Sequence, residues 1–190
     1  KAIRRCFSGP APPLEGSPLP TGRCLILVTP DAQRTMNTCP GASHELTTAR
    51  LDEDLIRSAA IVYLEGYLWG PDRPRAAMER AVAIAHDAGA KLVVDNVFAT
   101  PLLQKPLTLG ADIVTYSATK HIDGQGRVLG GIVLGSKAII TADVHTLLRQ
   151  TGASLSPFNA WVLLKGLETL PLRGRKMTES AAQVASFLSR

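Results

Sequence analysis

The sequence lacks several features that mark common classes of protein. It has only three cysteines in 190 residues, Cys6, Cys24 and Cys39, and their spacing fits neither a zinc site nor a disulfide framework. No apolar run reaches the roughly eighteen residues of a membrane-spanning helix, and the basic N-terminus is not followed by the apolar stretch of a secretory signal. We therefore expect a cytoplasmic protein in a reducing compartment, with no membrane association and no metal site.

Aromatic residues and strong charge are also scarce. Aromatic side chains make up 5% of the sequence and the net charge is +5. The lysines and arginines are scattered and are not interleaved with aromatic residues, so we expect no nucleic-acid partner. Hydrophobic residues make up 45% of the chain, which is enough to build the core of one ordinary domain or of two small ones.

Short apolar runs bounded by turn residues alternate with stretches of helical periodicity. The expected strands are 23–29 with its hairpin partner 34–38, then 60–64, 91–95, 113–116 and 131–134. The expected helices are 49–59 capped by Thr47 or Thr48, 76–88 ending at Gly89, 137–151, 157–168 and 173–190. Strands that alternate with helices predict an α/β fold of three layers around a mostly parallel sheet.

Two of the expected strands end in side chains that can carry chemistry. Asp95 ends the run Leu92-Val93-Val94, and Lys120 follows Ser117 and Thr119 just after the next strand. Because ligands collect at the carboxyl ends of strands in open α/β sheets, these residues suit pyridoxal 5'-phosphate (PLP). The lysine would form a Schiff base, the hydroxyls would bind phosphate, and Asp95 would hold the pyridine nitrogen protonated. From position alone, Asp95 as a turn cap and Lys120 as a surface lysine remain open alternatives.

The sequence around these residues resembles a known family. The fold-type I enzymes of Cys/Met metabolism have a signature that is similar to residues 94–101 and 116–121 of this sequence. Within that family, the O-succinylhomoserine sulfhydrylase branch most resembles residues 121–127, Gly130-Gly131 and 154–161. The resemblance runs from about residue 85 to the end of the chain. It implies PLP as cofactor and a role in trans-sulfuration, in homocysteine and methionine biosynthesis. The substrate would be a small amino acid, and the family is oligomeric, so a homo-oligomer is compatible with it.

The resemblance also implies a role for each site residue. Lys120 would form the internal aldimine and would move protons at the substrate carbons, Asp95 would pair with the pyridine nitrogen, and Ser117 and Thr119 would contact the phosphate. The family also uses an aromatic ring stacked on the cofactor and an arginine for the substrate carboxylate, and we assign neither here. We therefore expect cofactor binding with weak or no turnover by this chain alone.

The first half resembles a different family. Residues 21–38 and 60–69 are similar to the ribokinase/PfkB sugar and nucleoside kinases, near adenosine kinase, over about residues 1–89. The resemblance implies lid strands in the early part of that stretch and a strand and helix of the main sheet in the later part. This half lacks the Gly-Ala-Gly-Asp motif of those kinases and any Walker loop, so we expect no phosphoryl transfer.

These two resemblances predict two parts, a kinase-like fragment at 1–89 and a partial PLP-transferase domain at 90–190. The hypothesis is a hybrid chain, joined within residues 86–91. Two alternatives stay open at this stage: a kinase fragment without its catalytic motif, and a non-catalytic α/β remnant.

Overall fold

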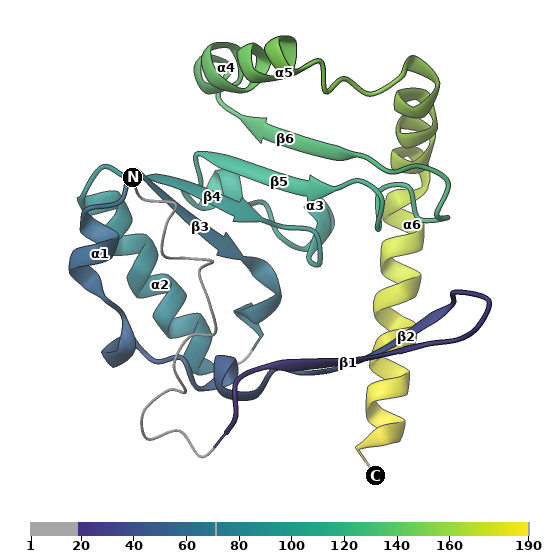
Figure 1. Cartoon of the computed structure of the whole chain (residues 1–190), viewed down its shortest axis with the longest axis horizontal. Coiled ribbons are helices and arrows are strands. Elements are labelled where there is room, and N and C mark those ends of the chain that lie inside the picture. The colour runs from purple at the N-terminus through teal and green to yellow at the C-terminus, as the bar shows by residue number, and fades with distance from the viewer. Residues whose placement is uncertain (1–18, 71, 190) are drawn as a thin grey trace. The chain divides into compact units, whose positions relative to one another are not determined.

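The structure is a computed structural model, and it describes residues 19–70 and 72–189. The chain separates into two compact units. Of the described residues, one unit contains 19–62, 68–70 and 72–90, and the other contains 63–67 and 91–189. Figure 1 shows the elements of both.

The first unit contains an antiparallel hairpin, β1 (Arg23–Val28) and β2 (Arg34–Cys39), in which Arg23 pairs with Cys39 and Val28 with Arg34. The hairpin partner predicted at 34–38 is thus confirmed. Every residue of both strands is exposed. An isolated two-stranded ribbon is only marginally stable in water, so this hairpin contributes little to the core.

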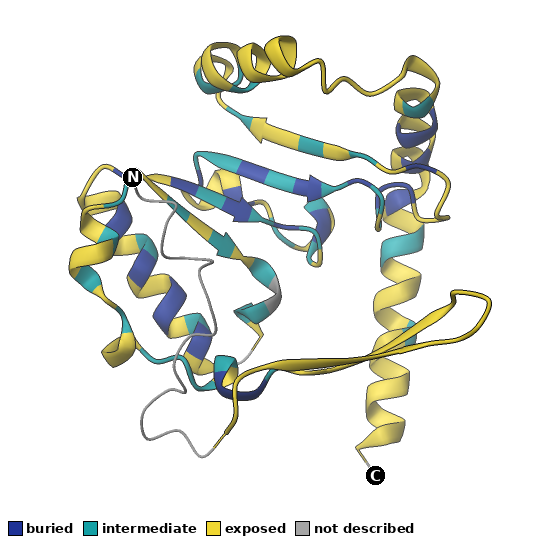
Figure 2. Ribbon diagram, viewed as in Figure 1, coloured by how far each residue is buried: buried dark blue, intermediate teal, exposed yellow. Residues whose placement is uncertain are grey.

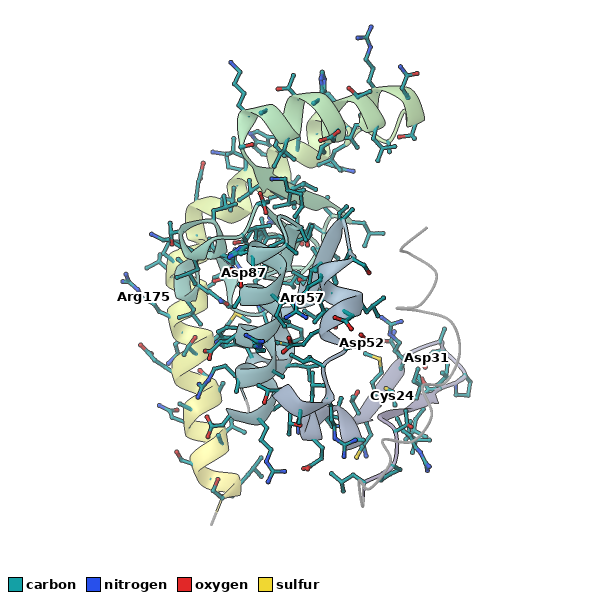
Figure 3. The ribbon with its side chains drawn as sticks, turned by 90° about the vertical axis from the view of Figure 1, so that its left-hand side faces the viewer. Cys24, Asp31, Asp52, Arg57, Asp87 and Arg175 are labelled. Carbon is teal, nitrogen blue, oxygen red and sulfur yellow. The ribbon has the colours of Figure 1, made fainter. Side chains whose placement is uncertain are left out.

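The helices of the first unit are α1 (Glu53–Arg57) and α2 (Asp72–Asp87). The prediction of one helix over 49–59 is wrong in its bounds: Thr48–Arg50 is a separate 3-10 turn, and α1 begins after Asp52. The Asp52 side chain accepts a 2.9 Å hydrogen bond from the Leu55 amide, so a carboxylate caps the helix and neither threonine does. Asp52 and Arg57 are labelled in Figure 3.

Helix α2 packs through a stripe of small and apolar residues. Buried positions recur at helical spacing: Pro74, Ala77, Met78, Ala81, Ile84 and Ala85. Figure 2 shows this stripe as the dark face of the helix. Gly89, with φ +72°, ends the helix in the left-handed conformation, as the sequence predicts. Arg80 binds Glu53 at 2.8 Å and so ties α2 to α1.

A four-stranded sheet has the order β3-β4-β5-β6. Its strands are β3 (Ile61–Glu65), β4 (Lys91–Asp95), β5 (Ile113–Ser117) and β6 (Gly131–Gly135). β4 and β5 are parallel, but β5 and β6 are antiparallel. The sheet is therefore mixed, and β6 runs against the direction that the prediction of a mostly parallel sheet implied.

Alternating burial explains why β4 and β5 lie at the centre of this sheet. Leu92 and Val94 on β4, and Val114 and Tyr116 on β5, are buried, and the residues between them are less so. This is the two-residue period of a strand. Ala118, Ile122, Val162, Leu163 and Leu170 extend the same core beyond the strands.

The remaining helices are α3 (Thr100–Leu103), α4 (Lys137–Ile139), α5 (His145–Thr151) and α6 (Pro157–Leu188). A π-helical turn, Ile140–Val144, lies between α4 and α5, so the stretch predicted as one helix is helical with a bulge. Two helices were predicted in the region of α6, but it is one helix of 32 residues that contains Pro171. The Arg173 guanidinium donates to the Gly166 carbonyl, one turn before the proline, at 2.7 Å. Arg175, on the same helix, is exposed (Figure 3).

Candidate active site

The carboxyl ends of β4 and β5 bring the predicted site residues to one edge of the sheet. Asp95 is the last residue of β4 and pairs in register with Thr115 on the parallel strand β5. Ser117 ends β5 two residues later, and the turn to Lys120 follows it directly. The expected placement of Asp95 and of the Ser117–Lys120 segment at neighbouring parallel strand ends is confirmed.

The Asp95 carboxylate is half-buried, and each of its two oxygens accepts a hydrogen bond. Oδ1 accepts a 3.0 Å hydrogen bond from the Val97 amide, and Oδ2 accepts one of 3.1 Å from the Tyr63 hydroxyl. An ionised carboxylate has about four lone-pair sites, so each oxygen can accept a further donor. Asp95 can therefore serve as an oriented acceptor for a cationic N–H group.

Asn96 secures the loop that follows Asp95. Its side chain is 1% exposed, and its amide nitrogen lies 3.0–3.2 Å from the Thr100 carbonyl, the Gln104 carbonyl and the Tyr116 hydroxyl. These bonds tie the loop between β4 and α3 to strand β5. The Asn96 Oδ1 atom has no partner among the described residues. Sequence reasoning missed this residue, although its place directly after a buried strand was a signal.

The segment from Ser117 to Lys120 forms a hydrogen-bonded turn. The Lys120 amide donates to the Ser117 carbonyl at 3.2 Å, and the Gly124 amide donates to the Lys120 carbonyl at 2.8 Å. The Thr119 hydroxyl accepts from the Gly130 amide at 3.0 Å and donates to the Gly130 carbonyl at 3.3 Å. Its proton could turn toward an anion while the shorter of these two bonds is kept.

Lys120 itself is exposed. Its amine makes no hydrogen bond or ion pair with residues 19–70 or 72–189 that would have to break before it reacted with an aldehyde. The turn around it is well ordered by backbone bonds, whereas the side chain is not tied down. This combination suits a lysine that has to reach a ligand.

Arg173 on α6 clamps the chain just beyond Lys120. Its guanidinium donates to the His121 carbonyl at 2.7 Å, to the Ile122 carbonyl at 3.1 Å and to the Gly166 carbonyl at 2.7 Å. Gly166 allows this close approach, because a Cβ there would overlap the Ile122 carbonyl oxygen. Sequence reasoning assigned no role to Arg173, and the structure gives it the role of a clamp.

Asp123 is a fully buried carboxylate that closes the loop after the turn. It accepts from the Arg127 amide at 2.6 Å and from the Arg127 guanidinium at 2.9 Å. Burial alone would raise the pKa of Asp123, but hydrogen bonds from Arg127 and the Gln125 amide outweigh it and hold that pKa below its usual value. Arg127 is therefore already bound to Asp123 within this loop.

Tyr63 has a perturbed acidity. Partial burial raises its pKa to about 12, with further contributions from its hydrogen bond to Asp95 and from the negative charges of Asp95 and Glu65, while a hydrogen bond with Thr115 opposes the shift. Because the folded-state pKa lies above the unfolded value of about 10, this phenol contributes stability that is complete below pH 10 or so. That contribution is lost as the pH rises through about 12.

We expect the Tyr63 phenol to titrate near pH 12 in the folded chain, and at a lower pH when Asp95 is replaced by asparagine, because the hydrogen bond and the charge of Asp95 add to the effect of burial. The measurement is the ultraviolet absorbance of tyrosinate during alkaline titration, with circular dichroism at each pH to show that the chain is folded. An unchanged Tyr63 midpoint in the Asp95→Asn protein would contradict the hydrogen bond to Asp95.

The described residues contain no group of three or more His, Cys, Asp or Glu side chains placed to hold a metal ion. They also form no helix with the length and apolar character needed to cross a membrane. A shallow open depression on α6, lined by Ala182, Gln183, Ser186 and Phe187, contains no ionisable side chain.

The comparisons with known proteins agree with this geometry. Residues 39–190 match the family model of the Cys/Met metabolism PLP-dependent enzymes. The chain belongs to this family. It is 60% identical over 106 residues to an O-succinylhomoserine sulfhydrylase of Mycobacterium tuberculosis, a match that covers 56% of this chain and 26% of the relative. It is 50% identical over 127 residues to the O-succinylhomoserine sulfhydrylase of Pseudomonas aeruginosa, which covers 65% and 31%.

Solved structures of the family show the same fold. The cystathionine gamma synthase of Xanthomonas oryzae pv. oryzae, in complex with cystathionine, superimposes with a TM-score of 0.62 at 36% identity. That match covers 68% of this chain and 33% of the synthase. The chain thus spans about a quarter to a third of the length of the relatives it matches.

The comparisons do not support the resemblance of residues 1–89 to the ribokinase/PfkB kinases. The family match begins at residue 39, so it includes more than half of the stretch that the sequence resemblance assigned to a kinase. A mixed α/β sheet is shared with the family, but a fused kinase-like part is not shown.

The donor set at the strand ends fits PLP, the cofactor that the family implies. It offers an oriented carboxylate at Asp95, hydroxyl groups at Ser117 and Thr119, and an exposed amine at Lys120. These groups match a pyridinium nitrogen, a phosphate and an aldehyde in turn. The roles of the four residues remain predictions.

Proposed function

We propose that this chain is the PLP-binding part of a trans-sulfuration enzyme of the O-succinylhomoserine sulfhydrylase type. The observation that carries the proposal is the meeting of Asp95 and the Ser117–Lys120 turn at the ends of two adjacent parallel strands. Identity of 60% to a sulfhydrylase, over 106 residues that include more than half of this chain, supports the choice of branch.

Each of the four side chains has its own proposed role. Asp95 would accept a hydrogen bond from the protonated ring nitrogen, and Ser117 and Thr119 would donate to the phosphate. The Lys120 amine would bind the aldehyde carbon and would later move protons at the substrate carbons. When bound, PLP supplies the electron sink that makes carbanion chemistry at an amino acid accessible.

The substrate class follows from the branch of the family. We propose an acylated homoserine and a sulfur nucleophile, with homocysteine and the released carboxylate as products. Arg127 is engaged by Asp123, and Arg173 by backbone carbonyls, so neither stands ready to bind a substrate carboxylate. We therefore propose that the chain alone binds PLP but turns substrate over weakly or not at all. Assembly into a homo-oligomer and a cytoplasmic location also remain proposals.

The division into a part at 1–89 and a part at 90–190 stays a hypothesis. In support of it, the described residues 19–62, 68–70 and 72–90 form one compact unit, and residues 91–189 belong to the other. However, residues 63–67 group with the second unit, and the family match begins at residue 39. We do not propose a kinase activity.

The proposal is tested by adding PLP to the purified chain, removing excess cofactor by dialysis, and recording visible absorbance. We expect a retained visible band at about one equivalent per chain, and weaker retention of pyridoxal, which lacks the phosphate that Ser117 and Thr119 would bind. Homocysteine release from O-succinylhomoserine and sulfide is measured in the same samples. A chain that is folded by circular dichroism but retains no PLP would overturn the proposed function.

A further inference from the structure

A hydrogen bond links the edge strand β3 to the carboxylate at the end of β4. The Tyr63 hydroxyl donates to Asp95 Oδ2 at 3.1 Å, across 32 positions of sequence. Both residues belong to the same compact unit, because residues 63–67 group with 91–190. Tyr63 therefore contacts a predicted cofactor ligand, although the sequence assigned its segment to a different family.

Two donors from different elements restrain the carboxylate. The Val97 amide holds Oδ1 from within the loop after β4, and Tyr63 holds Oδ2 from the neighbouring strand. A single amide would leave the carboxylate able to swing about its last torsion angle, whereas a second donor on the other oxygen removes most of that freedom. Both oxygens keep lone pairs for a further donor.

We propose that Tyr63 is a positioning residue, which holds the Asp95 carboxylate in the orientation that receives the protonated ring nitrogen of PLP. This inference rests on the proposed function, in which Asp95 binds that nitrogen. Tyr63 does not need to contact the cofactor, since it acts through Asp95.

The chemistry of the phenol suits this task. Its raised pKa of about 12 keeps it protonated at ordinary pH, so it donates to Asp95 and adds no second negative charge beside it. Tyr63 is 47% exposed, so removal of the hydroxyl leaves little buried polar surface without a partner. Loss of the Tyr63 hydroxyl should therefore lower the affinity for PLP more than it lowers the free energy of unfolding.

The test is a double-mutant cycle on the affinity for PLP, with the wild type, Tyr63→Phe, Asp95→Asn and the double variant. We expect Tyr63→Phe to weaken PLP binding about three- to tenfold, which is the cost of ordering one side chain on binding. In the Asp95→Asn background we expect Tyr63→Phe to have no further effect, because its partner has lost the charge that it positions. The midpoint of thermal unfolding should stay close to the wild type in all four proteins.

A second ligand separates positioning from general packing. We expect Tyr63→Phe to leave unchanged the affinity for the 1-deaza analogue of PLP, whose ring carries a carbon in place of the nitrogen. Equal weakening in both Asp95 backgrounds, equal weakening for both ligands, or no weakening at all would overturn the inference while leaving the proposed function intact. A folded wild type that binds no PLP would instead overturn the proposed function, and this inference would fall with it.

Discussion

Replacing Lys120 with alanine is expected to abolish the retained visible band of PLP, because no other described lysine lies at the strand ends with Asp95. After dialysis, the Lys120→Ala protein should show no visible absorbance from bound PLP. The free energy of unfolding should change by no more than about 0.5 kcal/mol, as is usual for an exposed side chain away from structural features. Visible absorbance and urea denaturation measure the two effects on the same samples.

The matched control for this variant is Lys176→Ala, a lysine on the exposed part of α6. We expect Lys176→Ala to retain as much PLP as the wild type does. If Lys120→Ala kept the band and Lys176→Ala lost it, Lys120 would be a surface lysine, and the assignment of the site would be wrong.

Replacing Gly166 with alanine is expected to destabilise the second unit by about 2 kcal/mol or more. A Cβ at this position would overlap the Ile122 carbonyl oxygen and lie 3.1 Å from its carbon, so backbone has to move. Forced shifts in a packed core cost roughly 1–3 kcal/mol, and the better helix propensity of alanine offsets up to about 1 kcal/mol of a larger strain. The measurement is the urea midpoint of unfolding.

The same substitution should also weaken PLP binding, because Ile122 lies two residues from Lys120 in the segment that Arg173 clamps. Gly174→Ala is the control on the same helix. A Cβ there meets the end of the exposed Leu102 side chain at 2.6 Å, which can move at little cost. Equal stability of the Gly166→Ala and Gly174→Ala proteins would contradict the close packing of α6 against the Lys120 segment.

The part of the site that is local in sequence could be predicted. The apolar run Leu92-Val93-Val94 predicts a strand, and the carboxyl end of that strand carries Asp95. In the same way, the apolar run before Tyr116 predicts the strand at whose end Ser117 lies. The order of these elements along the chain, together with the parallel pairing that α/β folds favour, was enough to bring the two ends together.

The partners that hold the site could not be predicted, because they are distant in sequence. Tyr63 reaches Asp95 from 32 residues away, and Arg173 reaches His121 from 52 residues away. Neither residue carries a local pattern that distinguishes it from other tyrosines and arginines. Their roles depend on the side-by-side order of strands and on the path of α6.

Local signals also misled the prediction of two helices. Pro171 is normally a reason to end a helix, yet α6 continues through it. Thr47 and Thr48 are good capping residues, but Asp52 competes with them and caps the helix that forms. At the start of α1, the hydrogen bond that Asp52 makes decides where the helix begins.

The central claim is that Lys120 is the residue that binds PLP covalently. The most direct test is to incubate the wild-type chain with PLP, reduce the adduct with borohydride, digest the protein and map the modified peptides by mass. The account predicts one pyridoxyl adduct, on Lys120. An adduct on another lysine in its place, or no adduct on a folded chain, would contradict it.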